Sequence, residues 1–128
     1  MKLLPDPCTF LWATSESSRL TDVMRDAIVS PDNEVFVSAA SFWEISIKFG
    51  LGKIVLPDDP GRYLPQLREK SGFRLLDIGE QAVCQVHRLP PIHRDPFDRI
   101  LICQANCHGL MIATDDAMIR QYPVQTIW

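Results

Sequence analysis

Short apolar runs alternate along the chain with longer segments in which apolar residues recur at helical spacing. Runs at 2–6, 35–37 and 110–113 predict strands, the last of them buried on both faces. Helical spacing at 18–30, followed by Pro31, predicts the first helix. The remaining pattern predicts helices at 60–71, 80–88 and 115–121, strands at 74–78 and 124–128, and an extended segment at 53–56.

Two further helices are predicted from residues in their first turns. Ser41 and Glu44 have the spacing of a capping box, which indicates a helix that begins at Ser41, and Gly50 and Gly52 are expected to end it. Asp95 is followed by proline, a combination typical of a helix start, because the acid caps free backbone N–H groups and proline suits the first helical position. This second helix is expected to end at Gly109.

The alternation of strands and helices indicates an α/β fold. Strands that are apolar throughout, separated by helices of about ten residues, predict a parallel sheet covered by helices. The 128 residues provide one domain, 1–128, since an independent domain needs roughly 100 residues or more. Ligands bind such sheets beyond the carboxyl ends of the strands. Acidic residues at that edge are therefore the first candidates for chemistry.

Composition and charge narrow the classes of protein. With 46% hydrophobic and 23% charged residues, the chain is typical of folded globular proteins, and intrinsic disorder is excluded. No apolar run approaches the roughly 20 residues of a membrane span, and the first residues lack a signal-peptide pattern. We therefore expect a cytoplasmic protein without a membrane segment. The net charge of −3 offers no overall attraction to nucleic acid, so any such binding must be local or assisted by a metal.

The four cysteines are expected to be free thiols, as is usual in a reducing cytosol. Cys103 and Cys107 lie four residues apart on one predicted helix face, next to His108. A zinc site there would need a second ligand pair at zinc spacing, which the sequence lacks. We expect these two cysteines to be buried helix residues.

Four acidic residues are predicted to meet at the carboxyl edge of the sheet. Asp6 ends the first strand, Asp116 follows the run at 110–113, and Glu44 and Asp98 lie in the first turns of two helices. Carboxylates that converge without cations repel one another, and a hard ion such as Mg²⁺ or Mn²⁺ relieves that repulsion. Such an ion can polarise a phosphoryl oxygen and generate a hydroxide nucleophile. The pattern therefore predicts metal-dependent phosphodiester hydrolysis.

Each acid also has a simpler interpretation when it is taken alone. Helix capping or a favourable position in a helix first turn accounts for Glu44, Asp98 and Asp116. Asp6 has no such cap to explain it, which makes it the strongest single candidate. The neighbouring Asp95 is assigned to capping, as is Asp115.

Basic and aromatic side chains add two further hypotheses. His93 and Arg94 lie beside the proposed edge and either contact phosphate or belong to a solvated loop. Aromatic residues gather at the predicted helices and form either a surface for contacts with a second copy or another protein, or part of the core; they are Trp12, Phe42, Trp43 and Phe49.

Four segments resemble the PIN-domain family, in particular its VapC-like toxins. They are Leu3-Leu4-Pro5-Asp6, the stretch from Val35 to Lys48, the stretch His93-Arg94-Asp95-Pro96-Phe97-Asp98-Arg99, and Ala113-Thr114-Asp115-Asp116. The resemblance extends from end to end of the chain. It implies a three-layer α/β/α PIN fold with a central parallel sheet of about five strands. It also implies an Mg²⁺- or Mn²⁺-dependent endoribonuclease acting on RNA, an antitoxin partner and a tendency to form a homodimer.

The resemblance also assigns site residues. The acidic positions of the family match Asp6, Glu44, Asp98 and Asp116, which agrees with the topological argument above. Thr114 would support the site through its hydroxyl. Arg94 and Arg99, in the third segment, are the candidates for substrate binding.

The chain departs from the family pattern around the first acid. Family members commonly read Leu-Asp-Thr-His or Leu-Asp-Ser here, whereas this chain has Pro5-Asp6-Pro7-Cys8. The expected hydroxyl is missing, and Pro5 would remove a hydrogen bond from an interior strand. The alternative function is therefore a catalytically impaired PIN domain that binds antitoxin or RNA. A receiver-like phosphoacceptor is disfavoured because the first strand lacks an adjacent acid pair.

Overall fold

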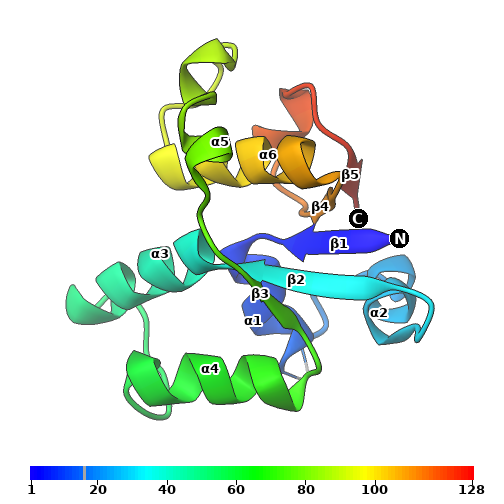
Figure 1. Cartoon of the computed structure of the whole chain (residues 1–128). Helices are drawn as coiled ribbons and strands as arrows, with labels where there is room; N and C mark the ends of the chain where they lie inside the picture. The colour runs from blue at the N-terminus through cyan, green and yellow to red at the C-terminus, as the bar shows by residue number, and fades with distance from the viewer. Residues whose placement is uncertain (16) are drawn as a thin grey trace.

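Five parallel strands form the central sheet of the computed structural model, which describes residues 1–15 and 17–128. The spatial order is β3-β2-β1-β4-β5, as Figure 1 shows. This arrangement confirms the predicted α/β class and the parallel sheet. The strands are β1 (Lys2–Pro5), β2 (Glu34–Ser38), β3 (Arg74–Leu76), β4 (Met111–Ala113) and β5 (Thr126–Ile127).

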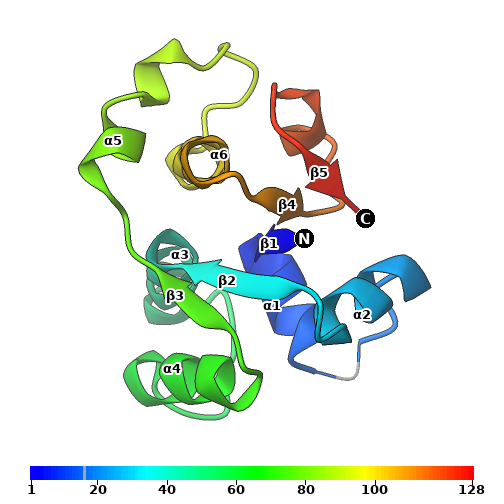
Figure 2. The ribbon, with the colours of Figure 1, turned by 45° about the vertical axis from the view of Figure 1, so that its right-hand side comes forward.

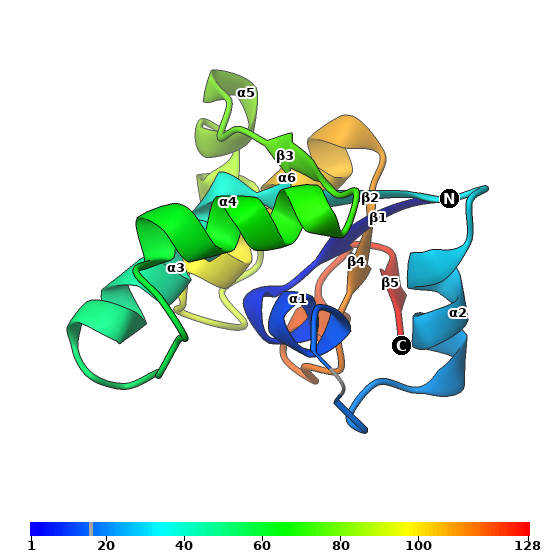
Figure 3. The same cartoon turned by 90° about the horizontal axis from the view of Figure 1, so that it is seen from below.

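Helices cover both faces of the sheet, so the fold has three layers. Figures 2 and 3 show α1 (Pro7–Ala13), α2 (Asp22–Val29) and α4 (Pro60–Lys70) on one face. The opposite face carries α6 (Pro96–His108), together with α5 (Glu80–Val83). Helix α3 (Ala39–Gly50) continues from the end of β2 and extends beyond the sheet edge. Two short 3₁₀ helices, η1 (Val86–Arg88) and η2 (Ile119–Gln121), complete the described elements.

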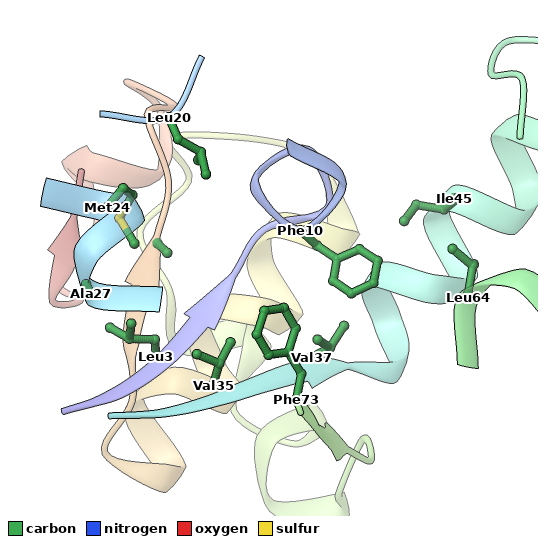
Figure 4. Packing of buried hydrophobic residues seen from close by; sticks show 11 residues of the cluster. Leu3, Phe10, Leu20, Met24, Ala27, Val35, Val37, Ile45, Leu64 and Phe73 are labelled. Atoms are coloured by element: carbon green, nitrogen blue, oxygen red, sulfur yellow. The ribbon is translucent and has the colours of Figure 1, made fainter. Parts of the chain in front are cut away.

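The central strand β1 supplies side chains to both cores. Leu3 packs in the cluster under α1 and α2 with Phe10 and Met24, as seen in Figure 4. Leu4 points to the other face and packs with Leu101 and neighbouring residues of α6. Successive strand residues face opposite sides of a sheet, so a strand covered on both sides has to be apolar throughout.

The two prolines around Asp6 fit this backbone. The N–H of Asp6 donates to the Ala113 carbonyl on β4 at 3.1 Å. Because successive residues of a strand bond to opposite neighbours, Pro5 faces β2, and the pairing of β1 with β2 covers only Lys2 and Leu3. Pro7 occupies the first position of α1, where its missing N–H has no helical partner to lose.

Several helix boundaries differ from the predicted ones. Helix α2 begins at Asp22 rather than at residue 18, because the Thr21 side chain accepts from Met24 N at 3.1 Å and caps it there. Helix α1 was not predicted. The predicted capping box of Ser41 and Glu44 is wrong. Ser38 caps α3, because its Oγ accepts from Ala40 N at 3.0 Å, and Ser41 lies inside the helix.

The other differences are shorter or missing elements. The segment 53–56 pairs with none of the described strands, and the helix predicted at 80–88 divides into α5 and η1. The helix predicted at 115–121 reduces to η2, and the last strand to the two residues of β5. Cys103 is buried as expected, Cys107 is half-buried, and all four cysteines are free. Within the described ranges, no helix is long and apolar enough to cross a membrane.

Candidate metal centre

All four predicted acids lie at the carboxyl edge of the sheet. Asp6 follows β1, Asp116 follows β4, and Asp98 lies in the first turn of α6. Glu44 lies in the second turn of α3. Helices α3 and α6 both begin near the carboxyl ends of the strands (Figure 1). Asp6, Glu44 and Asp98 are buried, with 6%, 8% and 8% of their surface exposed, and Asp116 is half-buried. Topology thus gathers three buried acids and a fourth at one edge.

Asp6 is held through both of its carboxylate oxygens. Oδ1 accepts from Thr9 N at 2.8 Å, so Asp6 is the N-cap of α1, which corrects the expectation that no cap explains it. Oδ2 accepts from the Thr114 hydroxyl, whose oxygen in turn accepts from Asp116 N at 3.0 Å. Burial raises the pKa of Asp6, and the hydrogen bonds from Thr114 and Thr9 offset part of that rise. Thr114 therefore links two of the predicted acids.

Asp98 has the most strongly shifted pKa among the four acids. Burial, together with the negative charges of Asp95, Glu44 and Asp116, raises its pKa from 3.8 to about 7. His93, whose Nε2 lies 3.0 Å from Asp98 Oδ2, opposes this rise. Burial and like charges together thus favour the neutral form of this carboxyl group, and a divalent cation would favour the ionised form instead.

Glu44 has a cation of its own. Its Oε2 lies 2.8 Å from Lys48 Nζ, one helical turn further along α3. The hydrogen bond and the charge of Glu44 raise the pKa of Lys48 further above neutrality. The lysine side chain is about half exposed. A positive charge thus lies at the rim of an otherwise acidic edge.

The donor set fits a hard divalent cation, although the side chains do not surround a single point. Among the residues that the structure describes, no three of the four predicted acids have oxygen atoms all within 4.8 Å of one another. Both oxygens of Asp6 accept hydrogen bonds, from Thr9 and Thr114, and Oε2 of Glu44 is paired with Lys48. Carboxylate oxygens nevertheless suit Mg²⁺ or Mn²⁺. Thr9 Oγ1, buried and without a partner in the described part of the chain, leaves one further oxygen free on α1.

Two residues of this edge were assigned other roles from the sequence. Asp95 caps α6 as predicted, with Oδ1 accepting from Phe97 N at 2.9 Å. Its ligand oxygen also lies within 4.8 Å of the ligand atoms of His93 and Asp98. His93 is half-buried against Asp98 rather than a member of a fully solvated loop. The spacing His-x-Asp-x-x-Asp was the available signal for this group.

The two candidate substrate-binding arginines differ in their surroundings. Arg94 is exposed beside the acidic edge. The Arg99 guanidinium points inward, where it donates to Val86 O and Pro90 O at 3.0 Å each and to Tyr122 Oη at 3.2 Å. These bonds tie the segment before α6 to the body of the protein, so Arg99 has a structural role in place of the expected contact with substrate.

The predicted aromatic surface divides in a similar way. Phe42 packs edge-on against Phe10 of the core, with ring centroids 5.4 Å apart, and Trp12 packs against Trp128. Trp43 is 58% exposed and contacts Phe97 at 5.0 Å. With Val83 and other apolar residues these two line a groove of about 340 Å³ between α3, α5 and α6. An apolar surface is therefore exposed here, whereas Trp12 and Phe42 are half-buried and pack against the core cluster.

A three-layer α/β/α fold with acids gathered at the carboxyl edge defines the general class. The PIN domain family model matches residues 3–125, and the chain belongs to the PIN-domain family. PIN domains are generally metal-dependent nucleases. A comparison with curated proteins found no match.

Solved structures of toxin–antitoxin complexes share this fold. The chain is similar to one in the crystal structure of VapBC2 from Rickettsia felis bound to a DNA fragment from their promoter, with 12% identity, a TM-score of 0.74, and coverage of 100% of this chain and 99% of that one. With a chain of DNA-bound VapBC from Salmonella typhimurium it shares 16% identity at a TM-score of 0.68, over 99% of this chain and 97% of that one. With a chain of FitAcB from Neisseria gonorrhoeae it shares 16% identity at a TM-score of 0.66, over 98% of this chain and 96% of that one.

Proposed function

We propose that this protein is a metal-dependent endoribonuclease and the toxin of a toxin–antitoxin pair. The observation that carries the proposal is the gathering of buried carboxylates at the carboxyl edge, where Asp6, Glu44 and Asp98 are 6%, 8% and 8% exposed and the charge of Asp116 reaches Asp98. Like charges are gathered at such a cost where a cation compensates them. Membership of the PIN-domain family and similarity to VapBC chains agree with this function.

The four acids would act together in the proposed reaction, as the ligand set of one metal centre. Asp98 and Asp116 would hold Mg²⁺ or Mn²⁺ together with Asp6, and Glu44 would complete the set. The bound ion would polarise a phosphoryl oxygen and activate water. Thr114 orients the carboxylate of Asp6 and the backbone of Asp116 at the same time.

Cations at the rim would bind the RNA backbone. The exposed Arg94 lies next to the acidic edge, and the ammonium group of Lys48 is held there by Glu44 at 2.8 Å. Both cations are local, so they attract phosphates even though the chain as a whole is negative. Arg99 serves this surface indirectly, because it fixes the segment that carries Arg94.

The proposed partners are an antitoxin and a second copy of the chain, in the cytoplasm. The apolar groove beside Trp43 offers a surface for such contacts, since exposed apolar patches commonly mark interaction sites. A second candidate function, an impaired PIN domain that only binds antitoxin or RNA, is favoured by one observation. Both oxygens of Asp6 are already occupied by Thr9 and Thr114.

Cleavage of a circular RNA by the purified chain tests the proposal, because a circle has no ends for an exonuclease. We expect cleavage with Mn²⁺ and none with chelator, and loss of cleavage in Asp116→Asn. Asp26→Asn, an exposed position on α2 far from the edge, is the matched control and should cleave normally. RNA binding without cleavage at any concentration of Mg²⁺ or Mn²⁺ would favour the impaired domain.

A further inference from the structure

Trp43 is the one tryptophan that the core does not bury. It exposes 58% of its surface, whereas Trp12 and Trp128 are half-buried against a core cluster. Its ring lies beside that of Phe97 on α6, with the centroids 5.0 Å apart and the ring planes at 83°. Rings at this angle meet edge to face, so each ring keeps a face that the other does not cover. The pair therefore presents uncovered aromatic surface to a ligand.

The aromatic pair lies next to the acidic edge. Glu44 follows Trp43 on α3, and Asp98 follows Phe97 on α6. The charge of Glu44 reaches Asp98 just as the ring of Trp43 reaches that of Phe97, so one acidic pair and one aromatic pair lie side by side between the two helices. Consecutive Cα atoms are 3.80 Å apart. A base on or beside a phosphate at the acids is therefore within reach of the rings.

Hollows flank Trp43 on both sides. The groove of about 340 Å³ towards α5 and α6 is lined by apolar side chains, and its volume is in the range of small-ligand sites. A second hollow of about 290 Å³ lies towards α4, where Pro60 and Leu64 contribute to its wall. A base that entered such a groove by its edge would lose hydrogen bonds to water. A base that lies flat on the indole keeps its polar edge in solvent.

Cations lie on either side of the aromatic pair. Arg94 is exposed three residues before Phe97 and makes no ion pair within the described residues. Lys48 is about half exposed, one turn beyond Glu44 on α3. A protein partner would need only the apolar groove, whereas a nucleic acid strand also uses cations that contact the phosphates beside a stacked base. The combination of exposed aromatic rings with flanking cations favours a nucleic acid strand.

We propose that Trp43 and Phe97 form a stacking platform for an unpaired base of the RNA strand, next to the phosphate at the metal centre. A base within a duplex has its faces covered by its neighbours, so the strand has to be single-stranded at this point. The platform offers faces rather than hydrogen-bonding side chains, so a purine should bind more tightly than a smaller pyrimidine. The proposal rests on the proposed function, because it names the form of RNA that the same centre accepts.

Fluorescence anisotropy with a labelled single-stranded RNA measures the platform separately from cleavage when chelator keeps the strand intact. Trp43→Ala should weaken binding of the single strand about 5- to 150-fold, and should weaken binding of a fully paired duplex of the same sequence much less. Trp43→Phe keeps a ring and should restore most of the affinity. Leu51→Ala, an exposed apolar residue at the far end of α3, is the matched control and should bind as the wild type does.

A strand that lacks one base identifies what the platform holds. An abasic nucleotide placed at each position in turn should weaken binding to the wild type most at one position. At that position it should not weaken binding to Trp43→Ala further, because the two changes remove the same contact. Loss of structure in the variant would not produce this dependence, since it would lower the affinity for every strand alike.

Three results would overturn the platform. They are unchanged binding of the single strand by Trp43→Ala, equal weakening for the single strand and the duplex, and abasic losses that add fully to the loss from Trp43→Ala. If light scattering shows that Trp43→Ala loses only self-association, the surface binds a second copy and the stacking is wrong. Each of these leaves the proposed function standing if the wild type cleaves RNA. A wild type that neither binds nor cleaves RNA would overturn both proposals.

Discussion

Asp98 should make the metal-free protein less stable as the pH rises, and Asp98→Asn should remove that dependence. The pKa of Asp98 is about 7 in the folded protein against an ordinary value of 3.8, so the folded state binds the proton more tightly than the unfolded chain does. Stability falls with pH wherever the folded state binds more protons. The destabilisation of the fold by ionised Asp98 is therefore small near pH 4, grows between pH 4 and 7, and reaches its full value above pH 7.

The magnitude follows from the difference between these pKa values. About three pKa units correspond to about 4 kcal/mol, at 1.36 kcal/mol per unit, as an upper bound for one buried group. In chelator, Asp98→Asn should therefore be more stable than the wild type by about 1–4 kcal/mol near pH 8, and nearly equal to it near pH 4. Asp6, whose pKa is raised by burial, adds a dependence of the same sign to both proteins.

Urea unfolding at several pH values, followed by tryptophan fluorescence, measures this difference. Asp26→Asn, which is exposed, controls for the loss of one charge and should follow the wild type at every pH. Equal pH profiles for the wild type and Asp98→Asn would refute the reasoning. So would a variant that is less stable than the wild type near pH 8, because the carboxylate would then stabilise the metal-free fold.

Three further outcomes are expected. Mn²⁺ at a concentration of one hundred times its dissociation constant should stabilise the wild type by about 2.7 kcal/mol and so raise its melting temperature, but should not change that of Asp98→Asn. Equal melting temperatures of the wild type in chelator and in Mn²⁺ would count against the site. Thr114→Val, which loses the bonds to Asp6 and Asp116, should reduce cleavage about 10- to 100-fold in RNA assays, while a Thr126→Val control on β5 keeps it. Arg99→Met should cost about 2–4 kcal/mol in urea unfolding, and a cost as small as that of Arg94→Met would show that the inward bonds contribute little.

The carboxyl edge was predictable because it follows from topology rather than from side-chain detail. Apolar strands at 2–6 and 110–113 indicate a parallel sheet, and a parallel sheet brings the residues after its strands to one edge. Asp6 and Asp116 follow from that argument alone. The helix that starts at Asp95 was equally predictable, because proline after a capping acid is a local signal.

The same local signal was overlooked at Asp6-Pro7, which opens α1, since the segment was assigned to the end of a strand. The capping box failed for a different reason. An N-cap residue has extended backbone, and β2 ends at Ser38, so Ser38 competes with Ser41 and prevails. The sequence pattern contains both serines but not the point where the strand ends.

The inward role of Arg99 had no signal in the sequence. The acceptors of its guanidinium hydrogen bonds are 9, 13 and 23 residues away in the sequence, at Pro90, Val86 and Tyr122. No periodic pattern connects such positions, because only the folded chain brings them together. The group of His93 with Asp95 and Asp98 is local, yet its closeness depends on the turn that Arg99 and Tyr122 hold.

The rate of RNA cleavage in Mg²⁺ by Asp98→Asn, beside that by Asp95→Asn, tests the central claim most directly. Asp98 is buried at the edge and its charge is needed to hold the ion, whereas Asp95 caps α6 through Phe97 N, a role that Asn fills as well. The account predicts that Asp98→Asn is folded and inactive in Mg²⁺ while Asp95→Asn retains cleavage. An active Asp98→Asn beside a folded but inactive Asp95→Asn would contradict it.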